Sequence, residues 1–174
     1  MRTSILAAAA ASVLFGALAV NAVAEDRVLT LPENYQTTFE KYLIADRMLN
    51  EDQVIAVYAD AKTRAAARAG EPIPDGTVIV AELYKAKLDE DGEVAESLIG
   101  RRIPEKLAAI VTMERRAEWA EQYPDDLKVG GWEFEVFSPT GENLGKDTTA
   151  CRECHQPLAD SEFLYTYDLM AGAN

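Results

Sequence analysis

Both cysteines and the only histidine of this 174-residue chain lie in one pentapeptide near its end, Cys151-Arg152-Glu153-Cys154-His155. This grouping restricts the fold, because no other thiol is present to form a disulfide between distant segments. It also argues against a zinc site, which needs four ligands and usually a second pair of Cys or His residues. A thioredoxin-type redox pair would lie near a βαβ pattern, which the sequence lacks.

The spacing C-x-x-C-H is the attachment signature of c-type haem. Two cysteines three residues apart on a helical turn point the same way, so both thiols can reach the vinyl groups on one porphyrin edge. The histidine that follows is then carried beneath the ring, where its imidazole can bind iron. We therefore predict one haem c, bound through thioethers to Cys151 and Cys154, with His155 as axial iron ligand.

The sixth coordination position of the iron is left open by the sequence. Since the chain has no second histidine, that position is empty, filled by water, or taken by another group such as a methionine. Met113 falls in a predicted strand and is one candidate ligand. Packing in the core is its favoured role.

The first 24 residues have the pattern of a secretory signal peptide. Arg2 supplies a positive charge, residues 5–20 are almost entirely apolar, and Ala22-Val23-Ala24 places small residues where a signal peptidase cuts. The apolar run is shorter than the ~20 residues that a membrane span needs. We therefore predict cleavage after Ala24, no membrane insertion afterwards, and a periplasmic protein, which agrees with the assembly of haem c outside the cytoplasm.

Residues 25–174 are of a size that suits a single domain with one core. The whole chain has a formal net charge of −13. Such an acidic surface repels phosphate backbones, which argues against nucleic acid and anionic membranes as partners. The charge either keeps the protein soluble or attracts a basic redox partner protein.

Strand-like runs dominate this domain. Runs rich in β-branched or aromatic residues predict strands at 54–58, 77–84, 107–113 and 132–137. Residues 60–69 predict a helix, with Asp60 as its cap and Gly70 as its end. The chain up to Asp46 fits a strand or a helix, and residues 163–170 fit a short helix or an edge strand. We therefore predict an α+β fold with a predominantly antiparallel sheet and a few short helices.

Several motifs occur together along the whole of residues 25–174. They are Leu31-Pro32-x-Asn34-Tyr35, Pro74-Asp75-Gly76-Thr77-Val78-Ile79-Val80-x-Glu82, Trp119, Gly131-Trp132-x-Phe134, the C-x-x-C-H pentapeptide and Phe163-x-Tyr165-x-Tyr167. In this order and spacing they resemble the cytochrome P-460 family and its sibling, cytochrome c-prime-beta. The resemblance implies a sheet-rich domain, usually a homodimer, that holds a five-coordinate haem c.

The sequence departs from this family at two positions. Members with the namesake spectrum cross-link a lysine to the porphyrin and oxidise hydroxylamine, and the resemblance places that lysine directly before Glu82. Here the residue is Ala81, whose methyl group cannot form the link. Those members also place a carboxylate over the iron, where Ile110 is the ungapped match. Ala81 and Ile110 are thus candidate residues of a distal pocket, or ordinary core residues.

Three functions are compatible with these features. The favoured one is a haem protein that binds nitric oxide or a similar small gas, or passes single electrons. The second is an oxidoreductase acting on hydroxylamine or a related nitrogen compound, with a shifted cross-link from Lys85, which has the strand parity of Ala81. It is disfavoured because N–O chemistry needs a proton acceptor near the substrate, and the predicted strand at 107–113 contains no acidic residue. The third is electron transfer with Met113 as sixth ligand.

Overall fold

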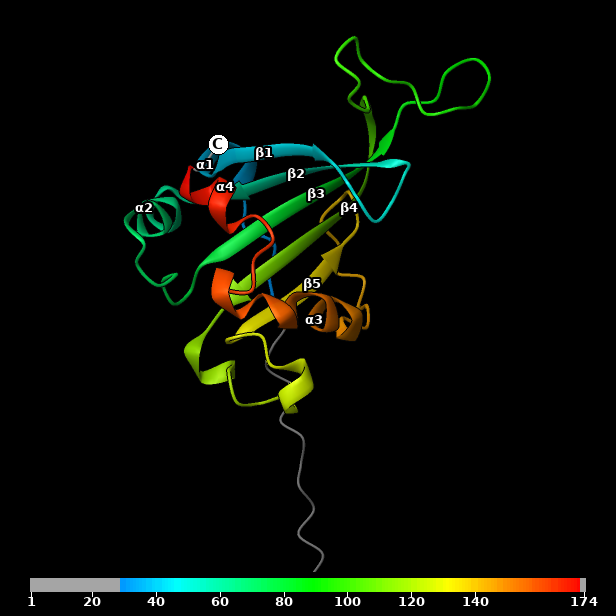
Figure 1. The fold of residues 1–174 in the computed structure, drawn as a ribbon. Helices are drawn as coiled ribbons and strands as arrows, with labels where there is room; N and C mark the ends of the chain where they lie inside the picture. Colours follow the sequence, from blue (N-terminus) through cyan, green and yellow to red (C-terminus); the bar gives the residue numbers. More distant parts are fainter. Residues whose placement is uncertain (1–28, 173–174) are drawn as a thin grey trace, which may run out of the picture.

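The computed structural model describes residues 29–172, so the predicted signal peptide lies outside the described residues. Its centre is one five-stranded antiparallel sheet in which every strand pairs with its neighbours in the sequence (Figure 1). The strands are β1 (Glu40–Asp46), β2 (Gln53–Ala59), β3 (Val78–Ala86), β4 (Pro104–Arg115) and β5 (Trp132–Phe137). The predicted α+β class and antiparallel pairing are confirmed.

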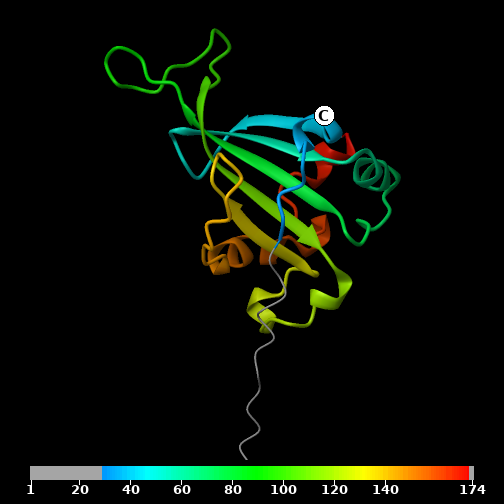
Figure 2. The same ribbon diagram turned by 180° about the vertical axis from the view of Figure 1, so that it is seen from behind.

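Helical segments lie on both sides of the sheet. The side facing the viewer in Figure 1, here called the front face, carries α3 (Thr149–His155) and α4 (Tyr167–Ala171), and α2 (Ala61–Ala69) lies at one end of the sheet, packed against α4. The opposite side, the back face, is crossed by the N-terminal segment that ends in α1 (Tyr35–Thr38), as Figure 2 shows. The C-terminal part of the chain therefore lies on the front face.

Two apolar clusters lie on the two faces because successive side chains of a strand point to opposite sides. The front cluster joins the sheet to the C-terminal segments and includes Val57, Ala59, Ile79, Met113, Trp132, Phe134, Leu164 and Met170. The back cluster comprises Tyr35, Ala56, Tyr58, Val80, Ile110 and Phe137. The two faces thus have separate side-chain environments.

The helix predicted at 60–69 is confirmed together with both of its end signals. Asp60 has extended backbone and accepts a hydrogen bond from the Thr63 amide at 2.6 Å, which satisfies one free N–H of the first turn. Gly70 ends the helix with φ of +67°, a left-handed conformation that glycine adopts without steric cost. The four predicted strands are likewise present.

The two ambiguous segments have different outcomes. Residues 35–46 form a single turn of helix, α1, followed by the edge strand β1. Residues 163–170 contain no strand; they lead into the short helix α4, which packs against α2 and β1. Three short 3₁₀ helices also occur, η1 (Ala117–Trp119), η2 (Asp125–Leu127) and η3 (Gln156–Ser161).

The connection between β3 and β4, residues 87–103, is a long excursion that extends beyond the sheet (Figure 1). We call it the arm. Its two sides are held by isolated bridges between Leu88 and Val94 and between Glu96 and Arg102. Near its tip, the side chain of Leu98 is fully exposed and that of Ile99 is 83% exposed. Among residues 29–172 no helix is long and apolar enough to cross a bilayer.

Candidate haem site

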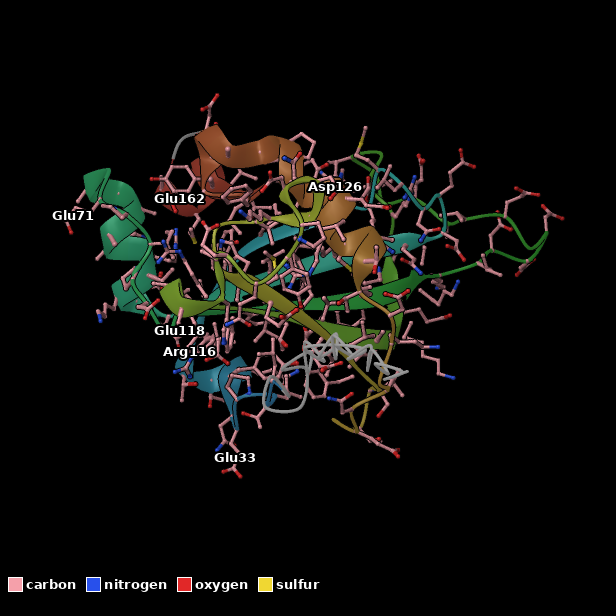
Figure 3. The ribbon with its side chains drawn as sticks, turned by 90° about the horizontal axis from the view of Figure 1, so that it is seen from below. Glu33, Glu71, Arg116, Glu118, Asp126 and Glu162 are labelled. Atoms are coloured by element: carbon pink, nitrogen blue, oxygen red, sulfur yellow. The ribbon has the colours of Figure 1, made fainter. Side chains whose placement is uncertain are left out.

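Helix α3 carries the whole C-x-x-C-H pentapeptide on the front side of the protein, beside the edge strand β5. Figure 3, seen from below, shows α3 next to the loop that holds Asp126, and α3 contacts the 3₁₀ helix η2 in that loop. Both thiols are free and half-buried. The predicted helical turn is confirmed, and it places Cys151 and Cys154 one turn apart on one helix.

The imidazole of His155 is fixed by a backbone acceptor. Its Nδ1 lies 2.6 Å from the carbonyl oxygen of Phe163. A carbonyl oxygen can only accept, so Nδ1 carries the hydrogen and Nε2 is left with a free lone pair. Metal-binding histidines are held in this way, with one ring nitrogen bonded to a second group and the other on the metal.

The surroundings of His155 keep the ring neutral and oriented. Burial lowers the pKa of His155 below its ordinary value, although the bond to Phe163 works in the opposite direction. The rings of Phe134 and Tyr165 meet the imidazole edge-on, with centroids 5.2 and 5.3 Å away. A neutral, oriented imidazole is the form that binds iron.

The two cysteines have different environments. Cys151 packs against the front cluster, and burial raises the pKa of its thiol. Cys154 lies beside the exposed Tyr165, whose hydroxyl donates to the Cys154 carbonyl at 2.9 Å and lies 3.2 Å from the sulfur. One thiol therefore faces the protein interior and the other lies near the surface, as two anchors along one edge of a flat ring would.

The front face of the sheet carries a group of apolar side chains that are only half-buried. They occupy adjacent strands in register, and they are Leu43, Ile55, Ala81, Leu83, Ala109, Val111 and Val136. None of these positions carries a charge. Apolar surface that is left partly open inside a covered face is what a porphyrin needs, because ligand sites are lined mostly by apolar groups.

Ala81 lies on this front face, in the same cluster as Cys151. Ile110 does not. It is 3% exposed in the back cluster, and it pairs with Glu82, the neighbour of Ala81. The partner of Ala81 on β4 is Val111. The structure therefore does not bring Ile110 together with Ala81 and His155, because a shift of one residue along a strand moves a side chain to the other face.

Met113 and Lys85, the other residues considered for this site, have defined contacts. Met113 is 8% exposed and packs in the front cluster opposite Phe134. Lys85 lies near the end of β3, half exposed, and forms an ion pair with Asp52. Lys85 is thus held by an acid at the end of the sheet.

A buried ion pair behind α3 has no counterpart among the sequence predictions. Arg152, between the two cysteines, is 3% exposed and forms an ion pair with Glu133 of β5. Its guanidinium carbon lies 3.4 Å from the centroid of the Tyr123 ring, and the Tyr123 hydroxyl donates to Glu133 at 2.7 Å. Arg152 occupies a variable position of C-x-x-C-H, so the motif itself carries no signal for this pair.

A second buried carboxylate, Glu82, lies on the back face. It is fully buried, and it accepts hydrogen bonds from the hydroxyls of Tyr35, Tyr58 and Tyr84 and from the Gln36 amide, at 2.5 to 2.8 Å. Burial raises the pKa of Glu82, but the four donors more than offset burial, so the pKa lies below its ordinary value. An acid within the apolar run of β3 was the one sequence signal for this cluster.

The residues present fit a covalently held haem. Two thiols and one neutral imidazole lie on one helix beside a half-buried apolar surface. Within residues 29–172, by contrast, no group of three or more His, Cys, Asp or Glu side chains is placed to hold a bare metal ion.

Comparison with known proteins agrees with this arrangement. A search of curated proteins gave no match. A family model described as Cytochrome P-460 matches residues 32–166, which include all five strands and the C-x-x-C-H helix. The chain thus belongs to the cytochrome P-460 family, and its membership implies a haem cofactor.

Proposed function

We propose that this protein is an exported c-type haem protein that binds a small gas such as nitric oxide or transfers single electrons. One haem is attached through Cys151 and Cys154, and His155 is its axial ligand. The observation that carries the proposal is the bond from His155 Nδ1 to the Phe163 carbonyl, which leaves Nε2 available on the helix that bears both thiols.

A haem bound at this site would supply an iron centre with one-electron redox chemistry. The protein side chains do the rest. His155 would hold the iron through Nε2, while the half-buried apolar group of the front face would exclude water and itself offers no proton acceptor. Such a surface accepts a small uncharged diatomic molecule.

Oxidation of hydroxylamine or a related nitrogen compound is the alternative, and membership of the family favours it. Two observations argue against it. Ala81 lies on the front face where the resemblance expects the cross-linking lysine, and Val111, its partner on β4, is apolar as well. Neither Ala81 nor Val111 carries a carboxylate, so neither can take the substrate proton.

Electron transfer with Met113 as sixth ligand is the third possibility. Met113 lies on the front face, as this role requires, but it packs among Ile79 and Phe134 in the core. A thioether ligand would produce a low-spin iron that ignores added carbon monoxide.

Absorption spectroscopy of the purified, exported protein separates these functions. We expect a high-spin ferrous form that binds carbon monoxide and nitric oxide and has an ordinary haem c spectrum. A strongly red-shifted ferrous band would favour the cross-linked enzyme, and a low-spin spectrum unchanged by carbon monoxide would favour methionine ligation.

Variants of the pentapeptide test the ligand assignment. Cys151→Ala and Cys154→Ala should each weaken haem retention, and His155→Ala should change the iron spectrum most. Glu153→Ala is the matched control, because Glu153 is an exposed member of the same motif. An unchanged spectrum in His155→Ala would refute the axial role of His155.

Export is tested by the mass of the protein recovered from the periplasm. We expect the chain to begin at residue 25 and to carry the added mass of one haem. A full-length chain with both thiols free would contradict the export and the haem attachment together.

A homodimer is part of the same proposal, and the exposed apolar tip of the arm supports it. Leu98 and Ile99 are held away from the domain, where a second copy of the chain can bury them. Sedimentation should report a dimer that Leu98→Asp with Ile99→Asp dissociates. A monomer at all concentrations would contradict the dimer and leave the haem assignment standing.

A further inference from the structure

The carbonyl that holds His155 belongs to a tight and unusual turn. Glu162 and Phe163, which follow η3, both have left-handed backbone, with φ of +54° and +60°. Neither residue is a glycine, and side chains rarely adopt this conformation because Cβ approaches the carbonyl oxygen. Such strain persists only where the surrounding structure imposes it, so the contacts that hold this turn are part of the site.

A single buried donor holds the first carbonyl of the turn. The indole Nε1–H of Trp132 donates to the Glu162 carbonyl at 2.9 Å. Trp132 is 1% exposed and is the largest of the fully buried side chains. It opens β5, which belongs to the sheet and not to the C-terminal segment. The indole bond of Trp132 therefore connects the turn to the sheet.

Gly130 fixes the second residue of the turn. The Phe163 ring lies so close to Gly130 that a Cβ added there would meet two ring carbons at 2.4 and 2.7 Å. Gly130 itself has φ of +62°, which a glycine adopts without cost. The Phe163 ring thus rests on bare backbone next to Trp132, and its own carbonyl is turned toward His155.

These contacts form a continuous path from the sheet to the imidazole. Trp132 holds the Glu162 carbonyl, the strained backbone sets the direction of the next carbonyl, and that carbonyl accepts from His155 Nδ1–H. A hydrogen bond at the far nitrogen fixes the ring plane of a metal-binding histidine and raises its basicity. Trp132 therefore influences the orientation and the donor strength of the His155 imidazole without forming a hydrogen bond to it.

We propose that Trp132 is the positioning residue of the axial histidine, and that it acts through its indole bond to Glu162 with Gly130 as the seat of Phe163. The inference rests on the proposed function, in which His155 binds haem iron. It assigns a physical role to the Gly130-Gly131-Trp132 segment. Backbone bonds from Phe163 to Leu158 and from Leu164 to Ser161 keep the turn closed, so loss of the indole donor reorients the Glu162 peptide without opening the turn. The bond to Nδ1 then weakens, and His155 becomes a poorer donor to the iron.

The test uses Trp132→Phe, which keeps an aromatic ring and removes the N–H. In the holoprotein we expect a lower iron–histidine stretching frequency in the resonance Raman spectrum and a higher reduction potential, with haem content unchanged. Tyr42→Phe is the matched control, because it removes a 2.8 Å bond to Thr166 in the same C-terminal segment without touching the turn. It should leave both quantities as in the wild type.

Because the chain has a single histidine, an NMR measurement that needs no activity assay gives a second test. Selective ¹⁵N-histidine labelling of the diamagnetic ferrous carbon monoxide form gives the ring signals of His155 alone. We expect exchange of Nδ1–H with water to become about tenfold faster in Trp132→Phe, which is the change expected if the Nδ1–H bond weakens by about the net free energy of one hydrogen bond. Gly130→Ala, which displaces Phe163, should act in the same direction if Trp132→Phe does not fold.

The outcomes separate this inference from the proposed function. If the wild-type protein carries no haem, the proposed function fails before any variant is compared. If haem is bound but Trp132→Phe keeps the wild-type iron–histidine frequency and Nδ1–H exchange, Trp132 is a core residue and the inference is wrong. Equal changes in Tyr42→Phe would also overturn it, because they would indicate general loosening of the C-terminal segment.

Discussion

Ala81 and Glu82 are consecutive residues of β3 whose side chains lie on opposite faces of the sheet. Ala81 belongs to the front cluster with Cys151, and Glu82 lies on the back face among three tyrosines. The position at which the resemblance expects a cross-link therefore lies on the opposite face of the sheet from a buried, ionised carboxylate. Substitutions at the two positions should have unrelated effects, the first on the porphyrin and the second on folding.

Ala81→Lys should restore the cross-linking position of the family. Because residue 81 is half-buried on the front face, a lysine there extends over the apolar surface that we assign to the porphyrin. Forming the link replaces one amine N–H and one porphyrin C–H by a C–N bond, so hydrogen peroxide is added as the two-electron oxidant. We then expect a red-shifted ferrous band and a haem peptide that joins segments of β3 and α3 in mass spectrometry. Ala81→Gln, of similar length but without an amine, is the control. Identical spectra for the two variants would show that position 81 is not within reach of the ring.

Glu82→Gln should destabilise the protein by roughly 2–4 kcal/mol at pH 7, because a buried carboxylate with four donors loses its charge-assisted bonds. The pKa of Glu82 is lowered from 4.5 in the folded protein. Its stabilisation is therefore complete above the unfolded-state pKa and is lost as the pH falls through the lower, folded-state pKa. Denaturant unfolding from pH 7 to pH 3 should show the gap between wild type and variant closing below pH 4.5.

Glu93→Gln is the control for this experiment, because Glu93 is an exposed acid of the arm. Its curve should follow the wild type at every pH. A gap for Glu82→Gln that stays constant across the range would mean that the carboxylate does not titrate in the folded protein as expected.

Arg152→Met should cost about 3–5 kcal/mol, since it leaves Glu133 buried without its cation. The double variant Arg152→Met with Glu133→Met should regain much of this loss, because removal of both charges leaves no unpaired ion. The free energy of unfolding in denaturant measures both effects. If the double variant is no more stable than Arg152→Met, the two charges do more than neutralise each other. The stability of α3 then depends on the specific geometry of the ion pair.

Met113→Leu should leave the iron unchanged. The substitution keeps the apolar volume, so we expect a stability cost below about 1.5 kcal/mol and the wild-type response to carbon monoxide. Met170→Leu, at a fully buried position of the same front cluster, is the control for packing. A change from low-spin to high-spin iron in Met113→Leu alone would establish the thioether as sixth ligand.

The sequence was sufficient for the elements that depend on local chemistry. The strand at 77–84 follows from its β-branched run, and α2 follows from Asp60 and Gly70, which satisfy its terminal backbone groups. The pentapeptide predicted a helical turn with two thiols on it, as found. These features need no knowledge of distant residues.

Features that depend on register or on distant partners were beyond the sequence. Ile110 was matched without gaps, and an offset of one residue is enough to change its face. Tyr35, Tyr58 and Tyr84 come from three different segments and meet only because β2, β3 and α1 are adjacent. The bond from Trp132 to Glu162 joins residues thirty apart, and no local pattern announces it.

The order of the strands also allows the sheet to form before the C-terminal segment docks on it. The sheet is complete at Phe137, before the chain reaches either thiol, and each strand needs only the one before it. Pairing between consecutive strands closes shorter loops than pairing between strands far apart in the chain, so it forms faster. If the proposed function holds, the sheet can assemble while Cys151 and Cys154, which follow β5 in the chain, are still accessible for haem attachment, and α3 docks on the protein afterwards.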